Sequence, residues 1–348
     1  MTDEAVVLGD LSRAERRELA AIARSARRAA GDVPAALVLA GEIGASLQAP
    51  GKGATAHLWS VLATVGAADL TVARVLEPHL DALAILEQAG LSAATGVWGV
   101  FAAEGPGEPL RAQPAGAAYT LDGRKHWCSL GAVLDRALVS ANVGQQRQLF
   151  AVDLGGPGVA AVSGTWVARG LTAVDSGPID FDRVGATAVG DPGWYLDRPG
   201  FAWGGIGVAA VWYGGAVGLA RRLTRSAAGR APDQVATMHL GAVDAALHGA
   251  RCVLADAATA TDGGLLTGRA GARAALRVRQ SVALAAEDVL RRCAHALGPG
   301  PLATDEEHAR RVADLELYLR QWHAERDQAA LGALLLEDQL LDDQAGAP

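Results

Sequence analysis

The sequence predicts an α+β fold in three successive parts: an N-terminal helical domain, a middle β-barrel or β-sandwich domain, and a C-terminal four-helix bundle. Two observations predict this order. Apolar residues recur at helical spacing up to about residue 90 and again from about residue 204. Between these regions they form short runs separated by turn residues, which is typical of strands. We place the domains at residues 1–93, 94–200 and 201–348.

The N-terminal domain is expected to contain helices. Ser12 and Glu15 have the spacing of a capping box, which predicts a helix over Leu11–Ala29. Apolar residues at helical spacing predict two more helices, over Thr55–Val75 and Pro78–Ala89.

The middle domain is expected to consist of short strands. We place them at Val97–Ala103, Ala117–Leu121, Lys125–Ser129, Arg136–Ala141, Gln148–Val152, Gly158–Val162, Thr165–Ala168, Pro178–Phe181 and Thr187–Val189. Asp122 and Gly123 separate two alternating runs, and this dipeptide predicts a two-residue hairpin turn.

The C-terminal part is expected to form the bundle. Its four predicted helices are Gly204–Ala228, Pro232–Ala260, Gly271–Leu297 and Asp305–Asp338. Long helices joined by short links favour antiparallel packing.

Composition excludes several classes of function. The chain carries 31 Lys and Arg against 38 Asp and Glu, a formal net charge of −7. No basic cluster is present, so we expect neither nucleic acid nor an anionic membrane as a partner. Cys128, Cys252 and Cys293 are far apart and give no metal-ligand spacing, so we predict no metal site. The cysteine usage and the polar N-terminus predict a cytoplasmic protein without a secretory signal.

Short motifs give weaker signals. Gly205–Ala210 matches a dinucleotide fingerprint, but the required preceding strand and following acidic residue are missing, so we interpret the glycines as helix-packing residues. In Lys125–Ser129, an aromatic beside a small hydroxyl residue is compatible with a ligand pocket, although Cys128 reads as a buried thiol. His323 and Asp327 lie four residues apart, which suits either an oriented imidazole or a surface ion pair.

These segments, in this domain order, resemble the acyl-CoA dehydrogenase superfamily of flavoproteins. The most specific match is Leu121–Ser129, which is similar to the family signature L-x-G-x-K-x-W-[IC]-[ST]. The other matching segments are Trp98–Glu104, Gly170–Ser176 with Ile179–Val184, Gly204–Leu223 and His295–Pro301. The resemblance extends from about Gly51 to Leu335.

The resemblance implies an FAD site. Trp127 would flank the flavin and Ser129 would hydrogen-bond near its N5 and O4 atoms, with Cys128 between them in the signature. Gly298 and Gly300 would approach the diphosphate from a neighbouring subunit, so a homodimer or homotetramer is implied.

Three departures from the family pattern bear on this site. The family's T-E-P near the flavin reads Ala103-Glu104-Gly105, and its R-x-x-F pair has no clear counterpart in Arg225–Gln234. Aligning the family's R-D pair with Ala313-Asp314 places the catalytic base near Trp322, and the alternative base position in Gly204–Gly218 has no carboxylate.

Because the family's base position has no carboxylate here, residues close to it in the sequence are the candidate catalytic and substrate-binding residues. We predict His323 and Glu325 as catalytic residues and Trp98 and Trp322 as substrate-binding residues.

The resemblance implies a flavin-dependent oxidoreductase. The first alternative is α,β-dehydrogenation of an acyl-CoA or another acyl thioester with FAD, with an electron-transfer flavoprotein as acceptor. The second is a flavin monooxygenase supplied by a flavin reductase, with His323 beside the flavin. The third is a non-catalytic scaffold that has lost the catalytic glutamate.

Overall fold

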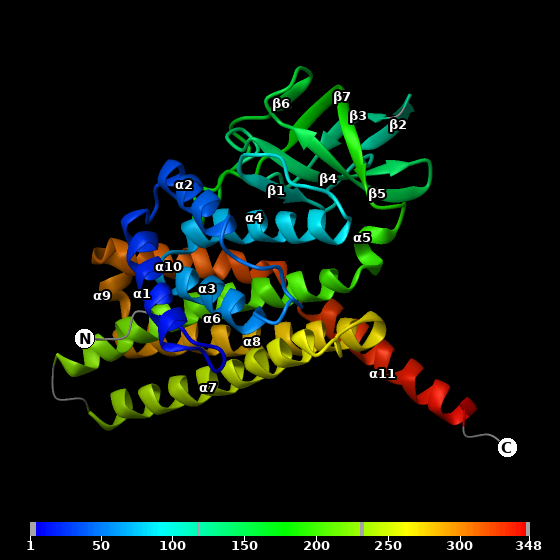
Figure 1. Cartoon of the computed structure of the whole chain (residues 1–348). Helices are drawn as coiled ribbons and strands as arrows, with labels where there is room; N and C mark the ends of the chain where they lie inside the picture. Colours follow the sequence, from blue (N-terminus) through cyan, green and yellow to red (C-terminus); the bar gives the residue numbers. More distant parts are fainter. Residues whose placement is uncertain (1–4, 117, 230–232, 346–348) are drawn as a thin grey trace.

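The computed structural model describes residues 5–116, 118–229 and 233–345. It confirms the α+β class and the strand-rich middle of the chain. Figure 1 shows the strands gathered at one end of the molecule, beside α4, and the long helices α6, α7 and α8 on the opposite side of that helix.

Four helices precede the strands: α1 (Arg13–Arg28), α2 (Val33–Gly44), α3 (Thr55–Ala68) and α4 (Leu70–Gln88). The capping box of Ser12 and Glu15 is confirmed at the start of α1. The predicted helix break before Pro78 is wrong, because Pro78 lies inside α4. The break occurs instead at Asp69, whose extended backbone ends α3 and whose side chain accepts a hydrogen bond from Val72 N in the first turn of α4. The helix α2 was not predicted.

Seven strands form the middle region. They are β1 (Trp98–Phe101), β2 (Arg111–Ala115), β3 (Ala118–Lys125), β4 (Arg136–Val143), β5 (Gln146–Asp153), β6 (Val159–Ala161) and β7 (Ile179–Val189). Their pairings run from β4 through β2, β3, β7 and β5 back to β4, a closed ring as in a barrel. β1 is added beside β4 and β6 beside β7.

The hairpin predicted at Asp122 and Gly123 is wrong. Both residues lie within β3, which continues through them beside β7 with a register shift between Leu121 and Gly123. Gly123 has φ +117°, a conformation that glycine supplies at a bulge as readily as at a turn. The strand predicted at Thr165–Ala168 is also wrong, because this segment has no regular structure.

The signature segment leaves the sheet early. β3 ends at Lys125, so a strand over Lys125–Ser129 is not formed. Trp127 and Leu130 both have positive φ, at 61° and 59°, and this irregular backbone turns the chain toward the helices.

The C-terminal helices begin after the short helix α5 (Trp194–Asp197). They are α6 (Pro199–Ala228), α7 (Gln234–Asp262), α8 (Gly268–Leu297), α9 (Pro299–Thr304), α10 (Glu306–Tyr318) and α11 (Glu325–Ala345). Pro232, predicted in the first turn of one helix, lies outside the described residues.

The single last helix predicted over Asp305–Asp338 is wrong. A 3-10 turn over Leu319–Gln321 and an irregular link at Trp322–Ala324 separate α10 from α11. Ala324 has φ 47°, which cannot continue an α-helix, and Figure 1 shows α11 leaving the body of the molecule in a new direction.

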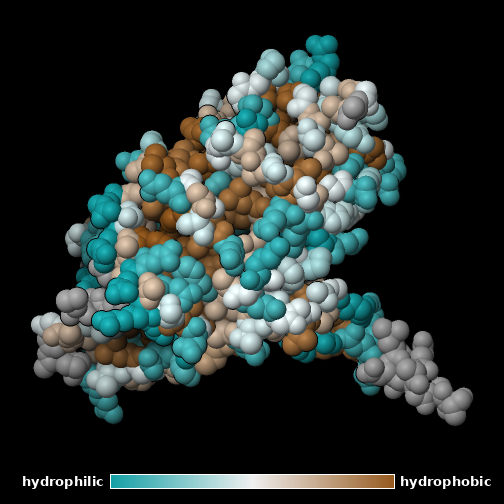
Figure 2. All heavy atoms as spheres, in the orientation of Figure 1, coloured by the Kyte–Doolittle hydropathy of each residue, from teal (hydrophilic) through white to brown (hydrophobic). Residues whose placement is uncertain are grey.

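The main core forms where α3 crosses α6. Both helices are buried on most of their surface, and Trp59 and Trp212 are among the largest fully buried side chains. α6 is long and apolar enough to cross a membrane by length and composition alone, but 72% of its apolar window is buried inside the protein. Figure 2 shows hydrophobic side chains on the visible face chiefly where the strands meet the helices.

Two of the polar contacts that dock the strand region on the helices have backbone donors. The backbone N of Trp98 on β1 donates to Nδ1 of His79 on α4, at 3.2 Å. The backbone N of Leu171, in the loop between β6 and β7, donates to the buried carboxylate of Asp314 on α10. A cavity lies beyond this junction, on the far side of α4.

Candidate functional site

A cavity of about 820 Å³ lies between α4, α5, α6, α8 and the start of α11; we call it the interhelical cavity. Its wall is mainly apolar and carries a few charged side chains: Glu77, Asp81, Asp197, Arg198, Arg269, Arg279, His323 and Asp327. A largely apolar pocket with few convergent polar groups is the usual form of a small-molecule site.

Glu77 is the buried acid of this cavity, with an exposed fraction of 9%. Its Oε2 atom accepts hydrogen bonds from the hydroxyl of Tyr318, at 3.2 Å, and from the guanidinium of Arg74, at 3.3 Å. Burial raises the pKa of Glu77 to about 7, and the neighbouring Arg74 only partly opposes this effect.

A second carboxylate, Asp81, lies one turn further along α4. The Nη2 atom of Arg198 lies 3.5 Å from Asp81 Oδ1, while Nη1 donates to Gln88 at 2.8 Å. The guanidinium also lies 5.3 Å from the ring centroid of Tyr195. Burial raises the pKa of Asp81, and Arg198 opposes this rise.

Arg279 on α8 has no comparable acidic partner. Its two Nη atoms donate to the backbone oxygens of Gly205, at 2.9 Å, and Gln321, at 2.7 Å. Its guanidinium lies 4.6 Å from the ring centroid of Trp212. Within the described part of the chain, no carboxylate forms an ion pair with Arg279 within 4.0 Å. Burial lowers the pKa of Arg279, and the charges of Asp327 and Glu77 partly oppose this effect. A planar guanidinium in the cavity wall without a paired carboxylate can accept an incoming anion as its partner.

The two predicted catalytic residues occupy different positions. His323 lies at the cavity rim with 64% of its side chain exposed, and its Nδ1 atom is 3.4 Å from Oδ1 of Asp327. This pair does not lie on one helix face, because α11 begins only at Glu325; the Asp327 carboxylate accepts from the backbone N of His323. Glu325 is exposed and is not part of the cavity wall.

The two predicted substrate-binding residues are buried outside the cavity wall. Trp322 is 5% exposed and its indole N–H has no hydrogen-bond partner, whereas the indole N–H of Trp98 donates to Ala94 O. Trp98 lines a small crevice beside Ser129, with Arg74 and Phe101.

The predicted cofactor residues are distributed over two regions. The Ser129 hydroxyl bonds to Arg74, at 3.1 Å, and to the Ser176 hydroxyl, at 2.8 Å. Cys128 is buried, with a pKa raised to about 12 by burial, which is the state of an inert thiol. Trp127, by contrast, is 54% exposed.

Glu104 makes a structural contact. Its carboxylate pairs with the buried Lys125, at 3.2 Å, and with Arg147, at 3.0 Å, and Lys125 also donates to Ser140. Ala103 beside it is exposed.

Gly298 and Gly300 lie where α8 passes into α9. No atom lies within 4 Å of the position that a Cβ would take on either glycine. Figure 1 shows α9 at the end of the helical region that is remote from the strands. One chain therefore does not bring these glycines to Ser129; their assignment to a neighbouring subunit stays a prediction.

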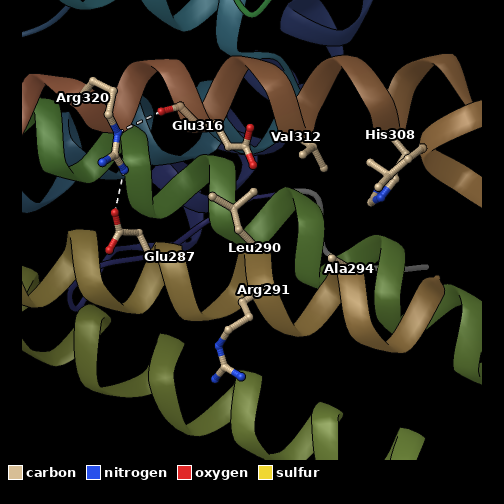
Figure 3. Close-up of a pocket in the computed structure, with 9 residues that line it drawn as sticks. Glu287, Leu290, Arg291, Ala294, His308, Val312, Glu316 and Arg320 are labelled. Carbon is tan, nitrogen blue, oxygen red and sulfur yellow. Dashed lines mark hydrogen bonds and ion pairs between the residues drawn. The ribbon is translucent and has the colours of Figure 1, made fainter. Parts of the chain in front are cut away.

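A second hollow of about 560 Å³ lies between α8 and α10 (Figure 3). Leu290 and Val312 lie toward its centre, while Arg320 donates to the Glu287 carboxylate at one end, at 2.6 Å. Among the residues that the structure describes, no group of three His, Cys, Asp or Glu side chains is arranged to hold a metal ion.

Comparison with known structures identifies the architecture. No protein-family model matches the sequence, and no curated protein matches it. Butyryl-CoA dehydrogenase from Megasphaera elsdenii is 16% identical, with a TM-score of 0.79 over 94% of this chain and 99% of that one. The chain has the acyl-CoA dehydrogenase fold.

Two further solved structures share the acyl-CoA dehydrogenase fold. KijD3, in complex with FMN and a dTDP-linked amino-keto sugar, is 18% identical, with a TM-score of 0.78 over 96% of this chain and 95% of that one. TdsC from Paenibacillus sp. A11-2, in complex with FMN and indole, is 15% identical, with a TM-score of 0.78 over 94% and 98%. These neighbours are flavin-binding proteins by their descriptions, and at this identity they establish the fold of this chain.

The acyl-CoA dehydrogenase fold allows the flavin prediction to be tested at Ser129. The crevice between Ser129, Arg74, Trp98 and Phe101 measures about 10 Å³, room for a single water molecule. The Ser129 hydroxyl is already bonded to Arg74 and Ser176. The Ser129 hydroxyl is thus engaged within the chain, while the exposed indole of Trp127 is available for stacking against a flavin ring.

Sequence reasoning missed the charged residues of the cavity, Glu77, Asp81, Arg198 and Arg279. A signal existed for one pair: Glu77 and Asp81 are two acids four residues apart in a strongly apolar helical stretch. Nothing in the local pattern marked Arg279, which is one of several arginines on α8.

Proposed function

We propose that the chain is an enzyme of the acyl-CoA dehydrogenase fold whose substrate binds in the interhelical cavity. The substrate is a small molecule with an anionic group on an apolar body. The observation that carries this proposal is Arg279, a half-buried guanidinium in an apolar wall that has no acidic partner within ion-pair distance in the described chain. A carboxylate of the ligand would supply that partner through charge-assisted hydrogen bonds.

The test is binding of octanoate by calorimetry, with neutral octanamide as the matched ligand. The Arg279→Met variant should bind octanoate about 10- to 100-fold more weakly, the range expected when one charged hydrogen-bonding partner is removed. Octanamide affinity should change little. Arg277→Met removes an exposed charge from the same helix and should leave both affinities unchanged. Equal octanoate binding by wild type and Arg279→Met would contradict the proposal.

The second candidate function is flavin-dependent oxidation, which the FMN complexes of two structural neighbours favour. Within it we keep two reactions: α,β-dehydrogenation of an acyl thioester with FAD, and oxygenation of a small molecule. The first needs an electron-transfer flavoprotein and the second a flavin reductase as partner. In either reaction the exposed indole of Trp127 would be the surface on which the flavin stacks.

A visible absorbance titration with FMN and with FAD tests the second candidate. A bound flavin band, bleached anaerobically by acyl-CoA, would support a dehydrogenase. A band that acyl-CoA does not bleach, but that a reductase system reduces, would support a monooxygenase. Absence of a flavin band would exclude flavin chemistry and leave two roles. Octanoate binding would then support a ligand site in the cavity, and no octanoate binding would support a scaffold role.

A further inference from the structure

Glu77 is the group in the interhelical cavity that the proposed anion site does not use. Its two hydrogen-bond donors, Tyr318 and Arg74, both bond to Oε2. No described residue donates to Oε1, and this atom is not among the fully buried unpartnered atoms. Glu77 forms part of the cavity wall, and Oε1 is its carboxyl oxygen that is free to bind a proton there.

Charged and titratable groups from several elements surround Glu77. Arg74 and Asp81 lie on α4 itself, Tyr318 on α10 and Arg279 on α8. Arg198 pairs with Asp81 before α6, and His323 and Asp327 face the cavity from the start of α11. Asp81 and Asp327 have partners, Arg198 and the His323 backbone N–H respectively. Glu77 is the buried carboxyl whose Oε1 atom is unpartnered.

An anion beside Arg279 changes this balance. Arg279 is one of the positive charges that favour the ionised form of Glu77. A ligand carboxylate would neutralise that influence and add a negative charge to the same poorly solvated space. Protonation of one carboxyl group relieves the repulsion, and Oε1 of Glu77 has room for the proton.

We propose that Glu77 takes up a proton at Oε1 when an anionic ligand enters the interhelical cavity, and is therefore the proton-transfer group of this site. The inference rests on the proposed function, because it requires an anion in the cavity. The proton comes from solvent, and no other bond forms or breaks. The α4 carboxyl would thereby act as an acid–base group of the interhelical cavity.

Calorimetry of octanoate binding in two buffers with different ionisation enthalpies measures this uptake directly. At pH 8, wild-type protein should take up about 0.4 to 0.9 proton per ligand, because one nearby charge shifts a buried carboxyl pKa by about 1 to 3 units and Glu77 starts from a pKa of about 7. At pH 5.5 the uptake should fall toward zero, because Glu77, with a pKa of about 7, is then already protonated. The Glu77→Gln variant should bind octanoate without proton uptake at either pH.

His323→Gln is the matched control, because it removes a titratable group from the cavity rim and leaves Glu77 in place. It should retain the wild-type proton uptake at pH 8. Wild-type binding without proton uptake, or equal uptake by Glu77→Gln, would overturn this inference and leave the anion site intact. Absence of any octanoate binding would overturn the proposed function and this inference together.

An infrared difference spectrum of the wild-type protein serves if Glu77→Gln does not fold. Addition of octanoate should convert one protein carboxylate band into a carboxylic acid band at pH 8, with ¹³C-labelled glutamate separating it from aspartate and from the ligand. Failure of a protein carboxylic acid band to appear while octanoate binds would exclude the proposal.

Discussion

Two buried titratable residues, Glu77 and His79, lie two positions apart on α4 and are shifted in opposite directions. Burial disfavours the charged form of each, so it raises the pKa of Glu77 to about 7 and lowers the pKa of His79 to about 4. His79 must be neutral at Nδ1 to accept the Trp98 backbone N–H. Both groups therefore link the stability of the protein to pH.

His79 should destabilise the protein as the medium becomes acidic. Its pKa is near 6.5 when unfolded and about 4 when folded, so the unfolded state binds the extra proton between these values. The free energy of unfolding should fall by about 3 kcal/mol through His79 as pH drops from 6.5 to 4. Urea unfolding of His79→Gln, compared with wild type across this range, should show a shallower pH dependence. The same slope in both proteins would show that His79 does not carry this linkage.

Glu77 should act in the opposite sense. Its folded pKa is raised above the unfolded value, so the folded state binds the extra proton and stability falls as pH rises from about 4.5 to 7. Glu77→Gln should unfold at a higher temperature than wild type at pH 8, with a gain of up to about 3 kcal/mol. The two proteins should converge near pH 4.5. A Glu77→Gln variant that is less stable at pH 8 would contradict this sign.

At the scale of elements, the crossing of α3 and α6 depends on glycine. A Cβ at Gly66 on α3 would lie 2.6 Å from Val211 O on α6, and a Cβ at Gly214 on α6 would overlap Ala63 O on α3. Two glycines thus face the partner backbone from opposite sides of one interface. The requirement applies to Gly214, whereas a Cβ at Gly205 or Gly207 of the dinucleotide-like motif would make only ordinary contacts, at 3.4 Å or more.

Gly214→Ala should therefore destabilise the protein by about 2 kcal/mol or more, because the overlapped atom is backbone and cannot move aside cheaply. Gly241→Ala on α7 is the matched control, since nothing lies within 4 Å of its Cβ position. It should be neutral or stabilising by about 0.5 to 1 kcal/mol through helix propensity. Chemical denaturation of both variants checks the difference, and equal stabilities would refute close backbone contact.

At the scale of the whole molecule, the strand region is held on the helices by few polar contacts. Asp314 on α10 is 3% exposed and accepts from the Leu171 backbone N–H. Gly170 approaches so closely that a Cβ there would overlap Ala313 O. These contacts join the loop before β7 to the helix that leads to the cavity.

Asp314→Ala should loosen this docking, because it leaves the buried Leu171 N–H without an acceptor. We expect faster proteolytic cleavage within residues 163–177 and little change in helical circular dichroism. Glu316→Ala, an exposed change on the same helix, should leave the cleavage rate at its wild-type value. Unchanged cleavage in Asp314→Ala would show that the loop is held by other contacts.

The order of helices, strands and helices was predictable from sequence because hydrophobic period is a local property. The α1 capping box was predictable for the same reason. Asp122 and Gly123 misled the prediction because a glycine with positive φ serves a bulge or a turn equally well, and only the partner strand decides which forms. The continuous helix through Pro78 likewise depends on its neighbours.

The sequence by itself determined that, along the chain, helices would precede and follow a strand-rich middle. It also determined that the family's base position is occupied by Trp322 and not by a carboxylate. Only the tertiary structure decided that Ser129 faces Arg74, and that Glu77 and Arg279 share one cavity. The physical reason is that burial, pKa and unpaired charge depend on which elements pack together. Residues far apart in the chain set these quantities, and no local pattern records them.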